Sequence, residues 1–90
     1  MRLRVFRGLA FLCPSGRPDR VLARYHGSRL PDVRKDSVLV LGADGRWRAT
    51  DLTARAPTRL TCPQAPSEVV ELWMMDPPVP GPGVARLFET

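Results

Sequence analysis

The stretch Ser37–Leu52, SVLVLGADGRWRATDL, contains two β-rich runs joined by Asp44-Gly45. Asp-Gly between apolar alternations is the strongest short-range signal for a β-hairpin, and a two-residue turn there pairs Leu41 with Arg48. In this interpretation Trp47 shares a face with apolar residues and belongs to the core. The opposite face also carries leucines, which is typical of strands that are covered on both sides. The residues expected beside Trp47 are Val38, Val40 and Ala49.

Short apolar runs separated by Pro and Gly predict further strands on both sides of this hairpin. Ten Pro and seven Gly in 90 residues leave no room for long helices. We therefore expect a mainly β fold, a small antiparallel sheet of about five to seven short strands with Pro/Gly-rich connectors. We expect the additional strands at 2–13 (bulged near Gly8), 20–25, 58–62, 68–75 and 84–90.

The Pro-rich segment 76–83, DPPVPGPG, cannot join a central sheet, because Pro lacks the N–H that a ladder needs. It therefore divides the chain into a β-rich core domain at 1–75, a connector at 76–83 and a short terminal strand at 84–90. We expect Trp47 and Trp73 to be the largest anchors of the core. The remaining core residues are expected to be Val5, Leu9, Phe11, Val38, Val40, Val70 and Leu72.

The two cysteines, Cys13 and Cys62, each directly precede a proline at the end of an expected strand. One interpretation is a disulfide, which in the chain-entropy model would contribute roughly 4 kcal/mol and would indicate an oxidising compartment. The other is a pair of buried, reduced thiols. A domain this small has little stability to spare, so the choice between them is important.

The residues that catalysis would need are sparse. His26 is the only imidazole, no Gly-x-Ser-x-Gly motif is present, and we expect an ordinary solvated histidine. The cysteines and His26 lack metal-ligand spacing, and no Gly-rich loop cradles phosphate, so we expect neither an enzyme nor a cofactor. The carboxylates Asp32, Asp36, Asp44 and Asp51 are assigned to turn, loop or surface positions.

The basic side chains leave a nucleic-acid alternative open. The net charge is +5, with thirteen Arg and one Lys, a bias that GC-rich codons also produce. In the alternative, Trp47 stacks on bases while nearby arginines bind phosphates. The arginines concerned are Arg46, Arg48, Arg55 and Arg59.

The order of the motifs resembles the globular head of prepilin-type pseudopilins, minor subunits of type II secretion or type IV pilus systems. The motifs are RVFRGLAFLC, YHGSRLPD, DSVLVLGADGRWR, a later CP and GPGVARLFE. The resemblance implies a non-enzymatic structural module that contacts other pilin or pseudopilin subunits, in the periplasm or at the inner membrane. The matching positions are Arg7, Gly8, Leu9, Cys13, Asp36, Ser37, Trp47, Cys62, Arg86 and Phe88.

Pseudopilins also have a basic leader and a long apolar helix before the head, and the sequence shows neither. The apolar run Gly8–Cys13 is shorter than the roughly 7 to 15 residues of a signal peptide, so the chain as written would be cytoplasmic by default. The resemblance therefore implies a fragment. A further hypothesis is a truncated or decayed protein that folds poorly.

Overall fold

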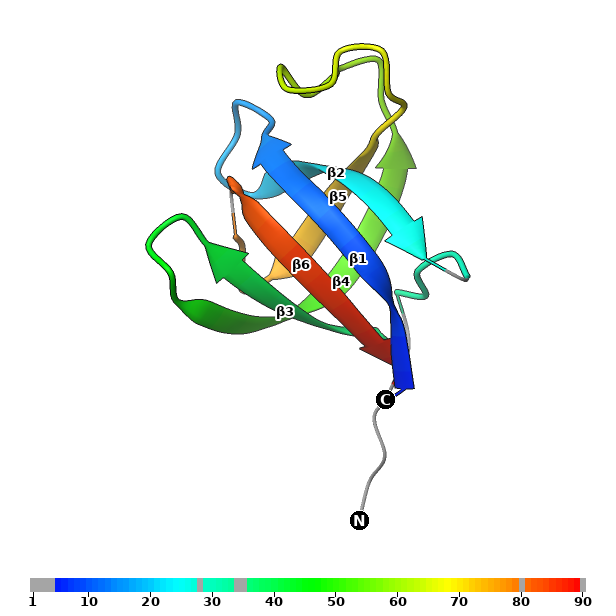
Figure 1. The fold of residues 1–90 in the computed structure, drawn as a ribbon, viewed down its shortest axis with the longest axis vertical. Helices are drawn as coiled ribbons and strands as arrows, with labels where there is room; N and C mark the ends of the chain where they lie inside the picture. Colours follow the sequence, from blue (N-terminus) through cyan, green and yellow to red (C-terminus); the bar gives the residue numbers. More distant parts are fainter. Residues whose placement is uncertain (1–4, 28, 34–35, 80, 90) are drawn as a thin grey trace.

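Six antiparallel strands form a closed barrel in the computed structural model, which describes residues 5–27, 29–33, 36–79 and 81–89 (Figure 1). The described residues form no helix, so none of them builds one that could cross a membrane. The prediction of a mainly β fold with five to seven strands is confirmed. The strands are β1 (Val5–Pro14), β2 (Arg20–Gly27), β3 (Asp36–Gly42), β4 (Trp47–Pro57), β5 (Glu71–Asp76) and β6 (Gly83–Glu89).

The strand order is β1-β2-β5-β4-β3-β6, and β6 pairs with β1 to close the barrel. Three consecutive strands, β3 to β5, lie next to one another, and β6 returns beside β3 in a Greek-key arrangement. The Pro-rich connector joins the end of β5 to the start of β6. The terminal strand is thus inserted between β1 and β3, and each described strand has a neighbour on both sides.

The turn between β3 and β4 differs from the predicted two-residue turn. The N–H of Gly42 donates to the carbonyl of Arg46 at 3.0 Å, so the loop has three residues, Ala43 to Gly45. Gly45 alone in this loop has a positive φ, +77°, as in a type I turn followed by a glycine bulge. Leu41 consequently pairs with Trp47 rather than with Arg48.

This one-residue change of register turns the β4 side chains to the other side of the sheet. Trp47 lies on the outside of the barrel and is 48% exposed. Its prediction as a core anchor is therefore wrong. Trp73, the other expected anchor, is fully buried inside the barrel, and its indole N–H donates to Glu71.

Two apolar clusters stabilise the fold, one inside the barrel and one outside it. The inner cluster surrounds Trp73 and includes Val38 and Val40, as expected. Leu9 is only half-buried and Phe11 is 39% exposed, because Ala10 and Leu12 are the β1 residues that face inward. Of the other core predictions, Val70 is buried, Leu72 is half-buried, and the side chain of Val5 lies outside the described residues.

The outer cluster lies under the loop 58–70 and contains Cys13, Leu22, Cys62 and Val70. The strand expected at 58–62 is wrong, since this segment is irregular and belongs to the loop. The expected strand at 68–75 starts only at Glu71.

A buried ion pair lies where β1 and β3 begin. The register of β1 against β6 shifts between Phe6 and Gly8, which confirms the expected bulge and leaves Arg7 facing Asp36 at 2.7 Å. The hydrogen bond to Asp36 raises the pKa of the Arg7 guanidinium, with Glu89 adding to the effect. Asp36 also accepts the N–H of Asp32. Its assignment to a loop or surface position is wrong, because its side chain is buried within the barrel end.

Candidate interaction surface

The outer side of β1, β6, β3 and β4 carries a continuous set of apolar side chains. Strand pairing places Phe11, Val84, Leu41 and Trp47 in one row across these four strands. The adjacent row contains Leu9, Arg86, Leu39 and Ala49, and Phe6 and Phe88 form a further cross-strand pair with ring centroids 5.7 Å apart. We call these ten residues the apolar face.

Three aromatic side chains of the apolar face are substantially exposed: Phe6 at 52%, Trp47 at 48% and Phe11 at 39%. Phe6 and Phe11 lie on β1 and Trp47 lies on β4, with β6 and β3 between these two strands, and Figure 1 shows β1 and β6 side by side along one side of the molecule. Scattered exposed apolar residues are ordinary, but a contiguous group indicates a binding surface. The described residues place no element over it.

Cationic side chains lie on the aromatic rings of this face. The guanidinium of Arg86 is 5.2 Å from the ring centroid of Trp47, and that of Arg24 is 5.1 Å from the ring of Phe11. Arg24 is also bonded to Glu68 at 2.8 Å. No carboxylate pairs with Arg86 within the described ranges, so this positive charge lies among apolar neighbours and is available to a partner.

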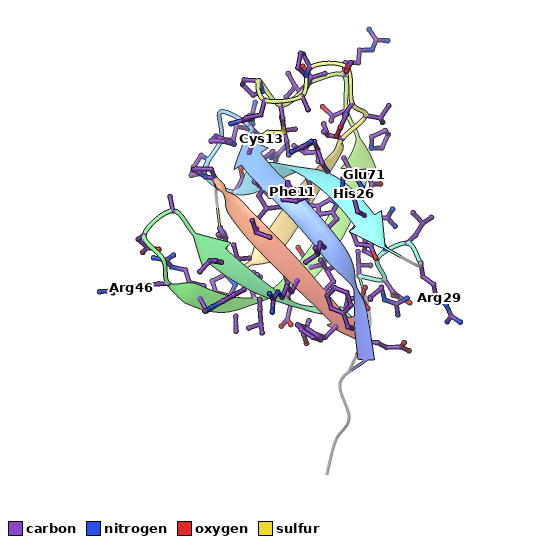
Figure 2. All side chains as sticks on the ribbon, viewed as in Figure 1. Phe11, Cys13, His26, Arg29, Arg46 and Glu71 are labelled. Atoms are coloured by element: carbon purple, nitrogen blue, oxygen red, sulfur yellow. A yellow bond between two sulfur atoms is a disulfide. The ribbon has the colours of Figure 1, made fainter. Side chains whose placement is uncertain are left out.

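A pocket of about 380 Å³ opens at one border of the apolar face. It lies between the end of β1, the start of β6, the β3–β4 turn and the loop around Cys62. Three residues of the face, Phe11, Leu41 and Val84, line it together with Arg24 and Gln64. Phe11 is labelled on β1 in Figure 2, close to Cys13. The pocket and the face therefore form one surface.

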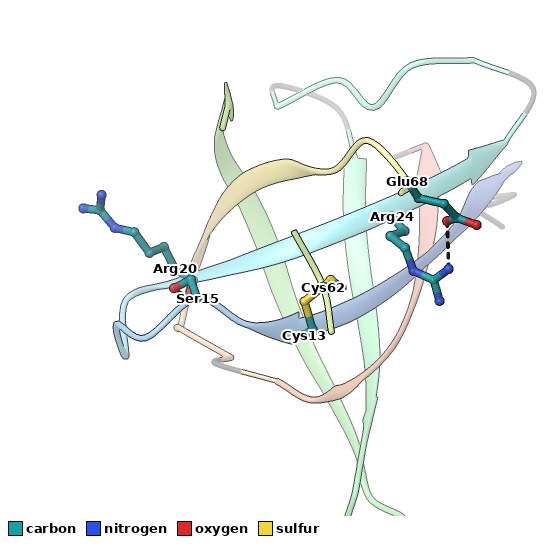
Figure 3. The surroundings of a disulfide bond; sticks show 6 residues. All are labelled: Cys13, Ser15, Arg20, Arg24, Cys62 and Glu68. Carbon is teal, nitrogen blue, oxygen red and sulfur yellow. Dashed lines mark hydrogen bonds and ion pairs between the residues drawn. A yellow bond between two sulfur atoms is a disulfide. The ribbon is translucent and has the colours of Figure 1, made fainter. Parts of the chain in front are cut away.

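The disulfide predicted between Cys13 and Cys62 is present, with the two Cα atoms 5.9 Å apart (Figure 3). It attaches the loop 58–70 to the end of β1, and both cysteines are almost fully buried. The ion pair between Arg24 and Glu68 provides a second attachment of the same loop, to β2. Together they fix the wall of the pocket that Cys62 and Gln64 form.

The four arginines of the nucleic-acid alternative do not gather in one patch. Arg46 lies at the β3–β4 turn (Figure 2), and Arg48 pairs with Asp44 at 2.7 Å, which lowers the pKa of Asp44. Arg55 binds Glu71 through two nitrogens and donates to the carbonyl of Pro31. Arg48 and Arg55 are seven positions apart on β4, roughly 23 Å. Arg59 is exposed in the loop after β4.

The residues considered for catalysis show no catalytic geometry in the part of the chain that the structure describes. His26 is exposed on β2, and its ring lies edge-on to Phe11 with centroids 6.0 Å apart. No group of three His, Cys, Asp or Glu side chains in the described ranges could hold a metal ion. Asp36 has a structural role in the buried pair with Arg7.

Comparisons with protein-family models, with curated proteins and with solved structures found no match to this chain. The proposed function therefore rests on the apolar face. The apolar face was not predicted as a site from the sequence. The residues that indicated it were Leu39 and Leu41, which lie on β3 opposite the expected core face.

Proposed function

We propose that this protein is a non-enzymatic interaction module that binds a partner protein on the apolar face. The observation that carries the proposal is the exposure of Phe6 and Phe11 on β1 and of Trp47 on β4, which apolar residues of β6 and β3 connect around the unpaired Arg86. Aromatic residues and arginine are the residue types enriched at the energetic centres of protein interfaces. A face of this composition is stabilised when a partner removes its rings from water.

The charge on the face defines the partner's chemistry. Arg86 lies among apolar neighbours, and covering it without a counter-charge would cost desolvation energy. A partner that supplies a carboxylate together with apolar side chains satisfies both requirements. We therefore propose an apolar protein segment that carries Asp or Glu.

The mode of binding follows from the closed barrel. Each described strand pairs on both sides, and the longest stretches that pair on one side alone are residues 24–27 of β2 and 47–50 and 52–57 of β4, so an added strand would gain few hydrogen bonds. We therefore propose that the partner lies on the outer side of the strands.

A neighbouring pilin or pseudopilin subunit is the partner that the resemblance implies, with a location in the periplasm or at the inner membrane. The disulfide supports an oxidising compartment, because such bonds are rare in the reducing cytosol. Membership of that family stays a prediction. The docking proposal rests on the apolar face alone.

Hydroxyl-radical footprinting tests the proposal by comparing the purified protein with the protein in its source cells. Oxidation of Trp47 and Phe11, read by mass spectrometry, is expected to be slower in the cells, while Leu30 serves as the reference. Leu30 is 72% exposed, lies in the β2–β3 connection and lines a hollow with Ala54 and Arg55 of β4, which are not residues of the face. Equal oxidation of Trp47 in both samples would refute docking on this face.

The exposure of Trp47 also favours a second candidate function, binding of single-stranded nucleic acid. Its indole is accessible as a stacking platform, Arg86 lies beside it, and the chain has a net charge of +5. Fluorescence anisotropy with a labelled oligothymidine at low salt tests this candidate. Binding that weakens steeply with salt and is lost in Trp47→Ala would support it. An unchanged anisotropy at micromolar protein would eliminate it.

A further inference from the structure

We infer that the pocket at the border of the apolar face is the anchor site for one aromatic or large aliphatic side chain of the partner. The partner segment is extended, and Arg86 binds a carboxylate on the partner residue two positions from that anchor residue. This inference rests on the proposed function and specifies the ligand of the same surface. The size of the pocket, its lining and its distance from Arg86 support this inference.

The size fits one bulky side chain. Ligand pockets span roughly 300–1,000 Å³, and an apolar cavity of about 150 Å³ already accepts benzene. At about 380 Å³ the pocket accommodates a phenylalanine or leucine side chain together with part of its backbone. It is at the small end for a free metabolite, which favours an anchor residue over an independent ligand.

The lining is rigid and largely apolar. The disulfide holds the wall that contains Cys62, and β6 starts at Gly83 against β3. A Cβ at Gly83 would lie 2.6 Å from the carbonyl oxygen of Leu41, so only glycine allows this close approach of the two strands. At the border, Gln64 offers an amide that can hydrogen-bond to a bound backbone.

Arg86 is placed to read a charge beside the anchor. Val84, which lines the pocket, and Arg86 are two residues apart on β6 and face the same side, roughly 7 Å from each other. Alternate residues of an extended peptide have the same spacing. Arg24 is the weaker candidate for this role, since it already pairs with Glu68.

Nuclear magnetic resonance titrations of the full chain test the inference with two tripeptides, acetyl-Glu-Ala-Phe-amide and its reverse, acetyl-Phe-Ala-Glu-amide. We expect at least one to bind with a dissociation constant on the order of 1 mM, as suits so small a ligand. The amide signals of Ala43, Gly83 and Val84 should shift. Replacing Phe in the peptide by Ala should weaken binding about tenfold, and replacing Glu by Gln up to about fivefold.

A matched pair of variants locates the anchor. Ala43 is exposed in the turn and lines the pocket, so Ala43→Trp fills it at a position where a type I turn accepts most residues. Val33→Trp adds the same ring at an exposed position in the β2–β3 connection, which joins the opposite end of β3. We expect Ala43→Trp to weaken the better tripeptide about tenfold and Val33→Trp to leave it unchanged.

The outcomes separate the anchor from the docking proposal. If neither tripeptide binds, or if Ala43→Trp binds as well as the parent chain, the anchor site is refuted, while protection of Trp47 in cells would still support docking. If a tripeptide binds but its Glu and Gln forms bind equally, the role of Arg86 is refuted. Loss of both peptide binding and footprint protection overturns the two proposals together.

Discussion

Removal of the disulfide is the perturbation whose magnitude the structure defines best. Cys13 and Cys62 are 49 residues apart, and in the chain-entropy model a loop of that length stabilises the fold by roughly 4 kcal/mol at 25 °C. In a domain of this size, 1 kcal/mol corresponds to about 4–8 °C of Tm. The double variant Cys13→Ala/Cys62→Ala should therefore melt roughly 16–32 °C below the parent chain.

The assay is thermal unfolding followed by far-ultraviolet circular dichroism, with reduced parent chain as the control. The reduced chain keeps both sulfur atoms in the outer cluster, so it isolates the covalent link from the packing around Leu22 and Val70. We expect the reduced chain and the double variant to melt within a few degrees of each other. A double variant whose Tm stays within about 5 °C of the oxidised chain would refute the reasoning that the cross-link stabilises the barrel.

Three further predictions concern the hairpin register, the single tyrosine and the turn. In the Trp73→Phe variant, the fluorescence of the remaining Trp47 should be at long wavelength and should be quenched by iodide. In the Trp47→Phe variant, the fluorescence of the buried Trp73 should resist quenching. Equal quenching in the two variants would contradict the register. Desolvation, aided by the charge of Asp36, raises the pKa of Tyr25 above its usual value of 10. The unfolded chain should then ionise first and stability should fall as the pH rises through that range, in step with phenolate absorbance; a phenolate titration at the ordinary pKa would oppose this. Gly45→Ala, at φ +77°, should cost about 1–2 kcal/mol in urea unfolding, and a neutral effect would argue against the three-residue loop.

The hairpin shows how far local sequence rules extend. Asp44-Gly45 correctly predicts that β3 and β4 are joined by a tight turn. The same letters fit a two-residue loop or a three-residue loop with glycine in the left-handed region, and only the pairing decides between them. The one additional residue in the loop determines whether Trp47 is in the core or on the surface.

β1 could not be oriented from its own residues. Both of its faces are apolar, so alternation cannot tell which side enters the barrel, and the structure buries Ala10 and Leu12 rather than Leu9 and Phe11. The choice depends on β6 closing the barrel between β1 and β3, a pairing between residues far apart in sequence. The apolar face arises from that closure, which is why the sequence alone did not reveal it as a site.

The disulfide and the bulge near Gly8 were more accessible, because they depend on individual residues. Two cysteines allow only one intramolecular pairing, and glycine beside a break in alternation is typical of a bulge. The buried pair of Arg7 and Asp36 follows from the same bulge. Nothing in the sequence showed that these two residues would meet.

Site-specific photo-crosslinking in the source cells tests the docking proposal most directly. A photoreactive phenylalanine analogue is placed at Phe11 and Trp47 on the apolar face and at Val33 as the exposed control. The account predicts one discrete protein adduct shared by the Phe11 and Trp47 positions, with a cross-linked segment that carries apolar and acidic residues, and no such adduct at Val33. Uncross-linked chain at both face positions, or the same adducts at Val33, would contradict it.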